Sequence, residues 1–148
     1  MALERYGRYA DKIRISAMGP KITIIDDEKE LVNTIKDLLE TRGFRVSFAY
    51  DGTSGLEVIK KESPDVIVLD IIMPKKDGRD LLKELKKDAA TKNIPVIMLT
   101  AKDEQFDRAS LLAMGAYEYI TKPYDSYALL RQIKNVLEKS GKSIEGQT

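Results

Sequence analysis

Short apolar segments alternate with stretches of helical periodicity from residue 21 onward, and this alternation limits the chain to few folds. The segments expected as strands are residues 21–25, 45–49, 65–69, 95–99 and 117–120. Between and after them, apolar residues recur at helical spacing, as in Leu31, Ile35 and Leu38. Strands that alternate with helices form a parallel sheet covered on both faces through right-handed crossovers. The pattern therefore predicts an α/β fold with a doubly wound, five-stranded parallel sheet.

Glycine, proline and turn residues indicate where the helices begin and end. Gly43 is expected as the C-cap of the first helix, and residues 63–64 (Ser-Pro) close the second. The turn at residues 75–78 leads into the third helix. The fourth begins with Phe106 and ends near Gly115.

Acidic residues stand at the ends of the first and third expected strands. Residues 22–25 run directly into Asp26 and Asp27, and Asp70 closes the apolar run that begins at Val66. A carboxylate in such a run is costly to bury unless it is paired. If the strand order is 2-1-3-4-5, these two strands are neighbours at the point where parallel α/β sheets bind ligands. We therefore expect one pocket with three carboxylates, which favours a bound cation.

A hydroxyl and an ammonium group complete the expected site. Thr100 follows the fourth expected strand and Lys122 follows the fifth, so both belong to the same rim of the sheet. Mg²⁺ suits this set because it binds one or two carboxylates, retains waters and leaves room for phosphate oxygens. Asp70 would be the nucleophile that becomes an aspartyl phosphate. Lys122 and Thr100 would bind oxygens of the phosphoryl group.

Composition excludes several other chemistries. The 148 residues, 43% of them hydrophobic, suit one domain with a folded core. Lys plus Arg total 25 and Asp plus Glu total 24, so no charge excess favours direct binding of nucleic acid. The absence of Cys and His excludes thiolate and imidazole catalysis and histidine metal ligands. No apolar stretch is long enough for membrane insertion, and a cytoplasmic protein is expected.

A set of short motifs, in order and at the expected strand ends, resembles the receiver domain of two-component response regulators, the family that includes the single-domain chemotaxis regulators. The motifs are Asp26-Asp27, Asp70 followed by Met73-Pro74 and Asp77-Gly78, Thr100-Ala101, Gly115-Ala116 and Lys122-Pro123. The resemblance covers residues 20–139 and implies a flavodoxin-like fold. Residues 1–19 are an N-terminal extension (a flexible stretch, an added helix or a cloning remnant), and residues 140–148 are a polar tail.

The resemblance assigns the metal site residue by residue. It implies that Asp70 is the phosphoacceptor and that Asp27 and Asp70 ligate Mg²⁺ directly. It also implies that Asp26 acts largely through water and that the backbone carbonyl of Ile72 completes the protein ligands.

The resemblance also assigns residues around the phosphoryl group. Thr100 and Lys122 would contact its oxygens, and Thr100 and Tyr119 fall at the family's switch positions. Ile72 and Lys102 occupy two variable positions that tune phosphoryl lifetime in the family. With Ile72 shielding the phosphoryl group from water, we expect a fairly long-lived phosphorylated state.

The implied partners follow from the absence of histidine. The family's phosphoryl donor is a phosphohistidine, so a sensor histidine kinase, a histidine phosphotransfer protein or a small acyl phosphate must supply the group. Phosphorylation would switch the face made by the last two helices and the last strand toward a downstream protein. A homodimer through that face stays open, as do the identity of the target and the presence of an output domain.

Three other interpretations account for part of this pattern of residues. Asp26 and Asp27 could simply cap the first helix, since Asp is favoured there. A Mg²⁺-dependent phosphatase of the haloacid dehalogenase type would also use an Asp nucleophile, but its second acid would fall at Ile72. A pseudo-receiver scaffold would bind its partner without phosphorylation. We favour a signalling switch that catalyses only its own phosphorylation and dephosphorylation.

Overall fold

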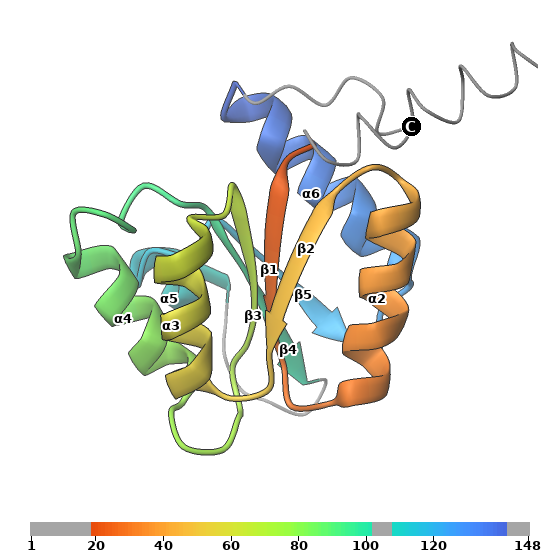
Figure 1. The fold of residues 1–148 in the computed structure, drawn as a ribbon. Coiled ribbons are helices and arrows are strands. Elements are labelled where there is room, and N and C mark those ends of the chain that lie inside the picture. The colour runs from red at the N-terminus through yellow and green to blue at the C-terminus, as the bar shows by residue number, and fades with distance from the viewer. Residues whose placement is uncertain (1–18, 102–107, 142–148) are drawn as a thin grey trace, which may run out of the picture.

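The computed structural model describes residues 19–101 and 108–141, and these form one parallel sheet between two layers of helices (Figure 1). The strands are β1 (Lys21–Ile25), β2 (Arg45–Ala49), β3 (Val66–Asp70), β4 (Val96–Ala101) and β5 (Glu118–Lys122). The helices are α2 (Lys29–Thr41), α3 (Gly52–Glu62), α4 (Gly78–Lys87), α5 (Arg108–Ala113) and α6 (Ser126–Lys139). The order β2-β1-β3-β4-β5 confirms the predicted fold.

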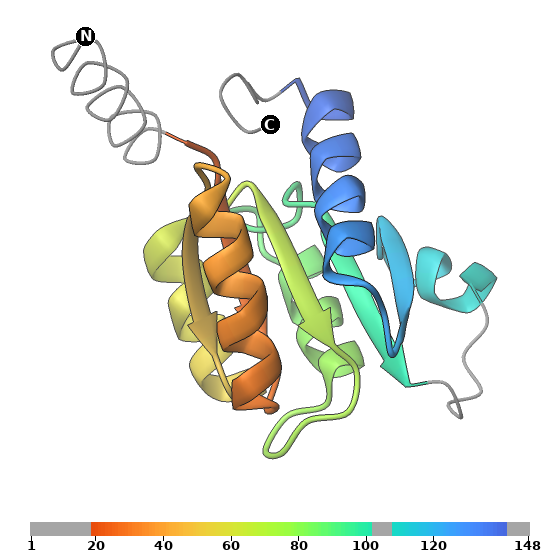
Figure 2. The ribbon, with the colours of Figure 1, turned by 90° about the vertical axis from the view of Figure 1, so that its right-hand side faces the viewer.

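The two faces of the sheet are buried by different helices. Helices α2 and α6 cover one face, and α3, α4 and α5 cover the other (Figure 2). In β3, Val66 and Val68 join the apolar cluster under α2 and α6, whereas Ile67 and Leu69 join the cluster under α3, α4 and α5. Because both faces are covered, every residue of this central strand is buried.

Two helix ends follow the predicted signals, namely the end of α3 at residues 63–64 and the turn at residues 75–78 that leads into α4. Asp51 and Asp77 cap α3 and α4 by accepting hydrogen bonds from the backbone N–H groups of Ser54 and Arg79. Ser63 ends α3 in the left-handed conformation.

The end of α2 differs from the prediction, and the predicted start of the fourth helix lies outside the described residues. The prediction for Gly43 was wrong by one residue: Arg42 is the C-cap of α2, and Gly43 follows it with φ of 91°. The left-handed turn lies just beyond the C-cap, and glycine adopts it at the lowest cost. Phe106 lies outside the described residues, and the described part of the fourth predicted helix begins at Arg108.

The last three strands extend further than the apolar pattern predicted. Asp70 is the last residue of β3 and pairs with Leu99, and Thr100 pairs with Thr121 inside the β4–β5 ladder. Lys122 is the last residue of β5. Backbone hydrogen bonds continue past the apolar part of a strand because they do not depend on side-chain polarity. Asp70, Thr100 and Lys122 are therefore held by the sheet rather than by loops.

Gly78, the first residue of α4, lies directly against the end of β3. Its N–H donates to the carbonyl oxygen of Ile71 at 2.7 Å. A Cβ atom added at Gly78 would lie 2.1 Å from the backbone oxygen of Asp70. Only glycine allows the start of α4 to approach the end of β3 so closely.

We predict that Gly78→Ala destabilises the protein by about 1–3 kcal/mol, because the added methyl group forces backbone to move. Urea denaturation measures this change. Lys83→Ala on the exposed side of the same helix is the control and should change stability by less than about 0.5 kcal/mol. Equal stability of Gly78→Ala and the parent chain would show that the α4 start relaxes freely.

Candidate functional site

Three carboxylates from neighbouring strands meet at the carboxyl edge of the sheet. Asp26 and Asp27 follow β1, and Asp70 ends β3, the strand beside it. One oxygen from each carboxylate lies within 4.8 Å of the others. Asp26 and Asp70 are only 1% and 5% exposed, whereas Asp27 faces solvent. The predicted convergence of these acids is confirmed.

Lys122 brings its ammonium group into this acidic cluster from the end of β5. Its Nζ lies 2.7 Å from Asp26 Oδ2 and 3.3 Å from Asp70 Oδ2. A third acid, Glu28, accepts a hydrogen bond from the same Nζ at 2.9 Å. Sequence reasoning missed Glu28, although its position directly after Asp26 and Asp27 could have marked it as part of the cluster.

The remaining predicted residues lie at different places around this cluster. Thr100 is buried near the end of β4, the strand beside β3, and its Oγ1 donates to Thr121 Oγ1 at 3.3 Å. Ile72, two residues beyond Asp70, is 58% exposed. Tyr119 is half-buried in β5 and packs against the core under α3, α4 and α5. Lys102 lies outside the described residues.

Burial and charge shift the pKa values of the central pair in physically distinct ways. Burial, assisted by the charge of Asp26, raises the pKa of Asp70 to about 7, although Lys122 opposes this shift. Burial alone would lower the pKa of Lys122, but its close contacts with the carboxylates of Asp26 and Glu28 outweigh this effect and raise that pKa. Lys122 is therefore charged at neutral pH. Its positive charge is not sufficient to offset the effect of burial and of Asp26 on the pKa of Asp70.

The donor set fits a hard divalent cation. Asp26, Glu28 and Asp70 share the ammonium group of Lys122, and the carboxylate of Asp27 lies in the same cluster. Within the described residues, Asp26 Oδ2 is buried without a hydrogen bond of good geometry and has only its ion pair with Lys122. Carboxylate oxygens with room for water are the ligands that Mg²⁺ takes in proteins.

The capping alternative explains only part of the acidic pair. Asp26 Oδ1 accepts the backbone N–H of Glu28 at 2.9 Å, so this carboxylate does support the start of α2. The residue at the N-cap position is Glu28, but its side chain accepts no capping hydrogen bond from the backbone of the helix. Asp26 thus serves both the turn and the acidic cluster.

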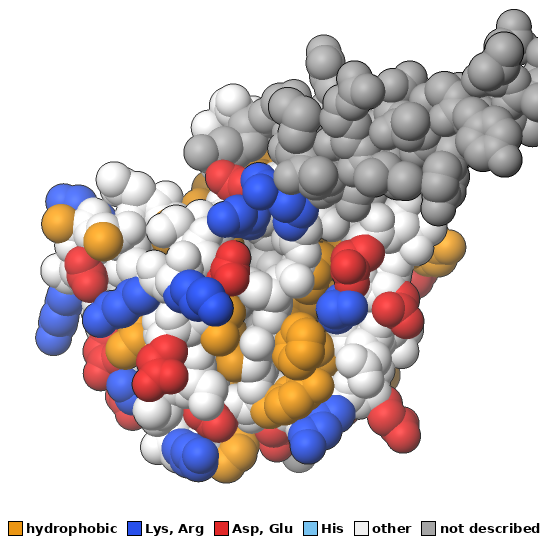
Figure 3. Space-filling view, viewed as in Figure 1, with side chains coloured by type: hydrophobic (Ala, Val, Ile, Leu, Met, Phe, Trp, Pro, Cys, Tyr) orange, Lys and Arg blue, Asp and Glu red, His pale blue; other side chains and the backbone are white. Residues whose placement is uncertain are grey.

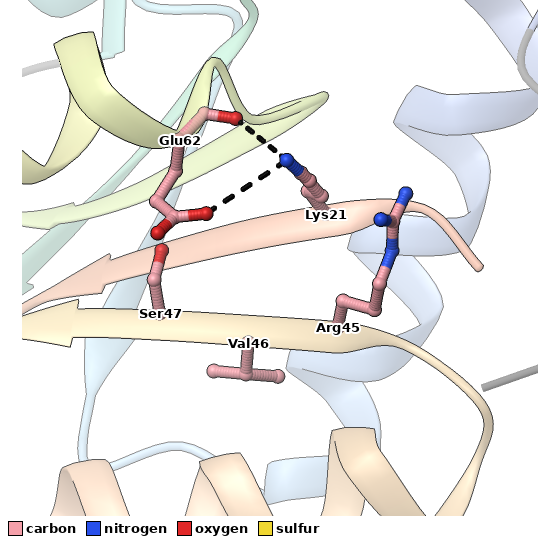
Figure 4. A pocket seen from close by; sticks show the side chains of 5 residues that line it. All are labelled: Lys21, Arg45, Val46, Ser47 and Glu62. Carbon is pink, nitrogen blue, oxygen red and sulfur yellow. Dashed lines mark hydrogen bonds and ion pairs between the residues drawn. The ribbon is translucent and has the colours of Figure 1, made fainter. Parts of the chain in front are cut away.

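A second pocket, of about 270 Å³, opens at the opposite end of the sheet, where β1 and β2 begin. Figure 4 shows its lining residues, which are Lys21, Arg45, Val46, Ser47 and Glu62. Both cations already have partners: Lys21 Nζ donates to Glu62 O at 3.1 Å, and Arg45 Nε donates to Gly19 O at 2.7 Å. This pocket brings together no set of acids like the one at the carboxyl edge.

Among the described residues, acidic and basic side chains are interspersed on the face shown in Figure 3. This agrees with the balanced charge of the sequence. Among the described residues, no helix is long and apolar enough to cross a membrane.

This sheet order, with paired acids after β1, an acid ending β3 and a lysine ending β5, defines a receiver domain. Comparison with known proteins agrees: the family profile "Response regulator receiver domain" matches residues 22–134. The chain belongs to that family, whose members are signalling switches of two-component systems.

Two relatives illustrate the extent of the similarity. The regulatory protein VanRc of Enterococcus gallinarum is 40% identical over 122 residues, which are 82% of this chain and 52% of that protein. The transcriptional regulatory protein CpxR of Escherichia coli K12 is 42% identical over 120 residues, or 81% of this chain and 50% of that protein. The chain thus spans about half the length of the curated relatives it matches.

Solved structures show the same fold. The Francisella response regulator 1452 receiver domain superposes with a TM-score of 0.75 at 34% identity, covering 82% of this chain and 99% of that one. The receiver domain of the sensor histidine kinase PA1611 from Pseudomonas aeruginosa PAO1, with magnesium coordinated in its active-site cleft, has a TM-score of 0.73 at 27% identity. That match covers 81% of this chain and 98% of the other.

We predict that Asp70→Asn stabilises the metal-free protein at neutral pH. The pKa of Asp70 is about 7 in the folded protein and near its ordinary value in the unfolded chain. The protonated carboxyl therefore favours folding, and this contribution is fully present at pH values below the ordinary pKa. This contribution is lost as pH rises toward 7, at about 1.4 kcal/mol for each pKa unit. The gain from the substitution should therefore be of the order of a few kcal/mol at pH 8 and small near pH 4.

Urea denaturation in the presence of a chelator, at several pH values, measures this difference. Asp37→Asn, which removes an exposed carboxylate on α2, is the control and should show no such pH dependence. A gain of equal size at pH 4 and pH 8 would contradict the raised pKa.

Proposed function

We propose that this receiver domain accepts a phosphoryl group on Asp70 and thereby switches its affinity for a partner protein. The observation that supports this most is the convergence of a buried Asp70 with Asp26, Asp27 and Lys122 at one edge of the sheet. We propose the receiver unit as residues 20–139, with residues 1–19 as an extension and 140–148 as a tail.

In the proposed step, a carboxylate oxygen of Asp70 attacks the phosphorus of a phosphohistidine or of an acyl phosphate. An O–P bond forms as the bond from phosphorus to the donor breaks, and the donor leaves with that electron pair. Later attack by water on phosphorus returns inorganic phosphate and the carboxylate. Apart from this self-catalysed cycle, we propose no enzymatic activity on a separate substrate.

We propose the metal ligands that the family resemblance implies, and the clustering of the three aspartates supports this choice. Asp27 and Asp70 would bind Mg²⁺ directly with the backbone carbonyl of Ile72, and Asp26 would act largely through water. When bound, Mg²⁺ supplies positive charge that offsets the carboxylates and the phosphoryl oxygens. The raised pKa of Asp70 supports this assignment, since a cation would favour the ionised nucleophile.

Lys122 and Thr100 are proposed to bind the phosphoryl oxygens. The ammonium group already lies 3.3 Å from Asp70 Oδ2, and the Thr100 hydroxyl comes from the strand beside β3. Thr100 and Tyr119 would transmit the change to the surface formed by α5, β5 and α6. That surface would then bind or release a downstream protein, or a second copy of the chain.

The proposed donor is a sensor histidine kinase or a histidine phosphotransfer protein in the cytoplasm. VanRc and CpxR are named as regulatory proteins, and CpxR as a transcriptional one. By analogy with these relatives, we propose an effect on transcription that is exerted through a partner or a further segment, without direct contact between the receiver domain and nucleic acid.

We predict that incubation with acetyl phosphate and Mg²⁺ adds the mass of one phosphoryl group. The group should be lost on hydroxylamine treatment, because an acyl phosphate reacts with this nucleophile. Asp70→Asn should abolish the addition, whereas Asp37→Asn should retain it. An unmodified parent chain would favour a pseudo-receiver scaffold, and steady turnover of a phosphate ester would favour a phosphatase.

We predict that Ile72→Asn shortens the lifetime of the phosphorylated state several-fold. The exposed Ile72 side chain lies two residues beyond the phosphoacceptor, where an amide could orient the attacking water. Decay of the phosphorylated form after removal of acetyl phosphate measures the lifetime. Ile72→Val, which keeps an apolar side chain, is the control; decay of Ile72→Asn at the parent rate would contradict the shielding role.

A further inference from the structure

Glu28 makes an ion pair with Lys122 that metal binding and phosphoryl transfer do not explain. Its Oε1 accepts a hydrogen bond from Lys122 Nζ at 2.9 Å, which is shorter than the 3.3 Å from the same nitrogen to Asp70 Oδ2. The Lys122 side chain is 15% exposed, and that of Glu28 is 59% exposed. Glu28 therefore contacts the ammonium group of Lys122 from the solvent side, whereas the buried acids Asp26 and Asp70 contact it from the interior.

The local structure indicates that Glu28 is at this position for a reason other than helix stability. It is the N-cap residue of α2, where Ser, Thr, Asp and Asn are favoured because their short side chains accept backbone hydrogen bonds. The Glu28 side chain makes no such bond, and its own N–H is satisfied by Asp26. The Glu28 side chain therefore does not cap the helix, and its carboxylate contacts Lys122 instead.

We propose that Glu28 is a positioning residue that restrains Lys122 and slows phosphorylation of Asp70. This inference rests on the proposed phosphoacceptor role of Asp70. The ammonium group must turn toward the phosphoryl oxygens during transfer, and each interaction with Glu28 must weaken as it does so. An interaction that is stronger in the resting protein than in the transition state lowers the rate.

Three single variants separate the contact from the charge. Glu28→Gln removes the charge and weakens the contact with Lys122. Glu28→Asp keeps the charge but shortens the side chain by about 1.5 Å, which takes the carboxylate out of reach of Nζ. Glu30→Gln removes the same charge from an exposed residue two positions further along α2, for whose side chain the described structure records no ion pair.

The measurement is the rate of phosphorylation by acetyl phosphate at saturating Mg²⁺, followed by intact mass. We expect both Glu28→Gln and Glu28→Asp to react about 2- to 5-fold faster than the parent chain, as loss of one partly exposed ion pair implies. Glu30→Gln should change the rate by less than about 1.5-fold, because salt screens a charge that is not in contact. Thermal unfolding of each variant shows whether the fold is intact.

The other outcomes overturn the inference. If Glu28→Asp reacts like the parent chain while Glu28→Gln is faster, only the charge matters. If Glu28→Gln matches Glu30→Gln or is slower than the parent chain, Glu28 does not restrain Lys122. Failure of the parent chain to become phosphorylated would instead contradict the proposed function.

Discussion

The ammonium group of Lys122 is the interaction on which the candidate site depends. It lies within 3.3 Å of two carboxylates. One belongs to Asp70, which ends β3, and the other to Asp26, which directly follows β1. Without it, two buried acids would face each other with no compensating charge, which is costly in a protein interior. The parallel order β2-β1-β3-β4-β5 allows this arrangement, because the carboxyl ends of all five strands lie along one edge.

The rest of the structure supplies rigidity for that charged edge. The apolar faces of β3 and its neighbours are buried under α2 and α6 on one side and under α3, α4 and α5 on the other. Gly78 lets α4 begin against the backbone of Asp70. The site itself opposes stability, since burial and Asp26 raise the pKa of Asp70. A folded core offsets this cost, as is common where function requires an unfavourable arrangement.

Prediction from sequence succeeded where the physical rule is local or topological. Apolar periodicity located all five strands, whereas their order, which the pattern alone leaves open, was expected from the resemblance to receiver domains. It failed at boundaries: Asp70, Thr100 and Lys122 belong to strands, because backbone pairing outlasts the apolar pattern. Glu28 was missed for a different reason. Its position directly after Asp26 and Asp27 points to the acidic cluster, but no local pattern contains its contact with Lys122, which is 94 residues away along the chain.

The sequence by itself determined the fold class, the family and the identity of the acids, hydroxyl and lysine at the strand ends. The fold class follows from periodicity and the site residues from residue type at the strand ends, whereas the family follows from the resemblance of a set of short motifs in order. Only the tertiary structure decided how the ammonium group is divided among Asp26, Glu28 and Asp70, and how deeply each acid is buried. Such distances depend on the register of strands and helices far apart in sequence, which no local pattern contains.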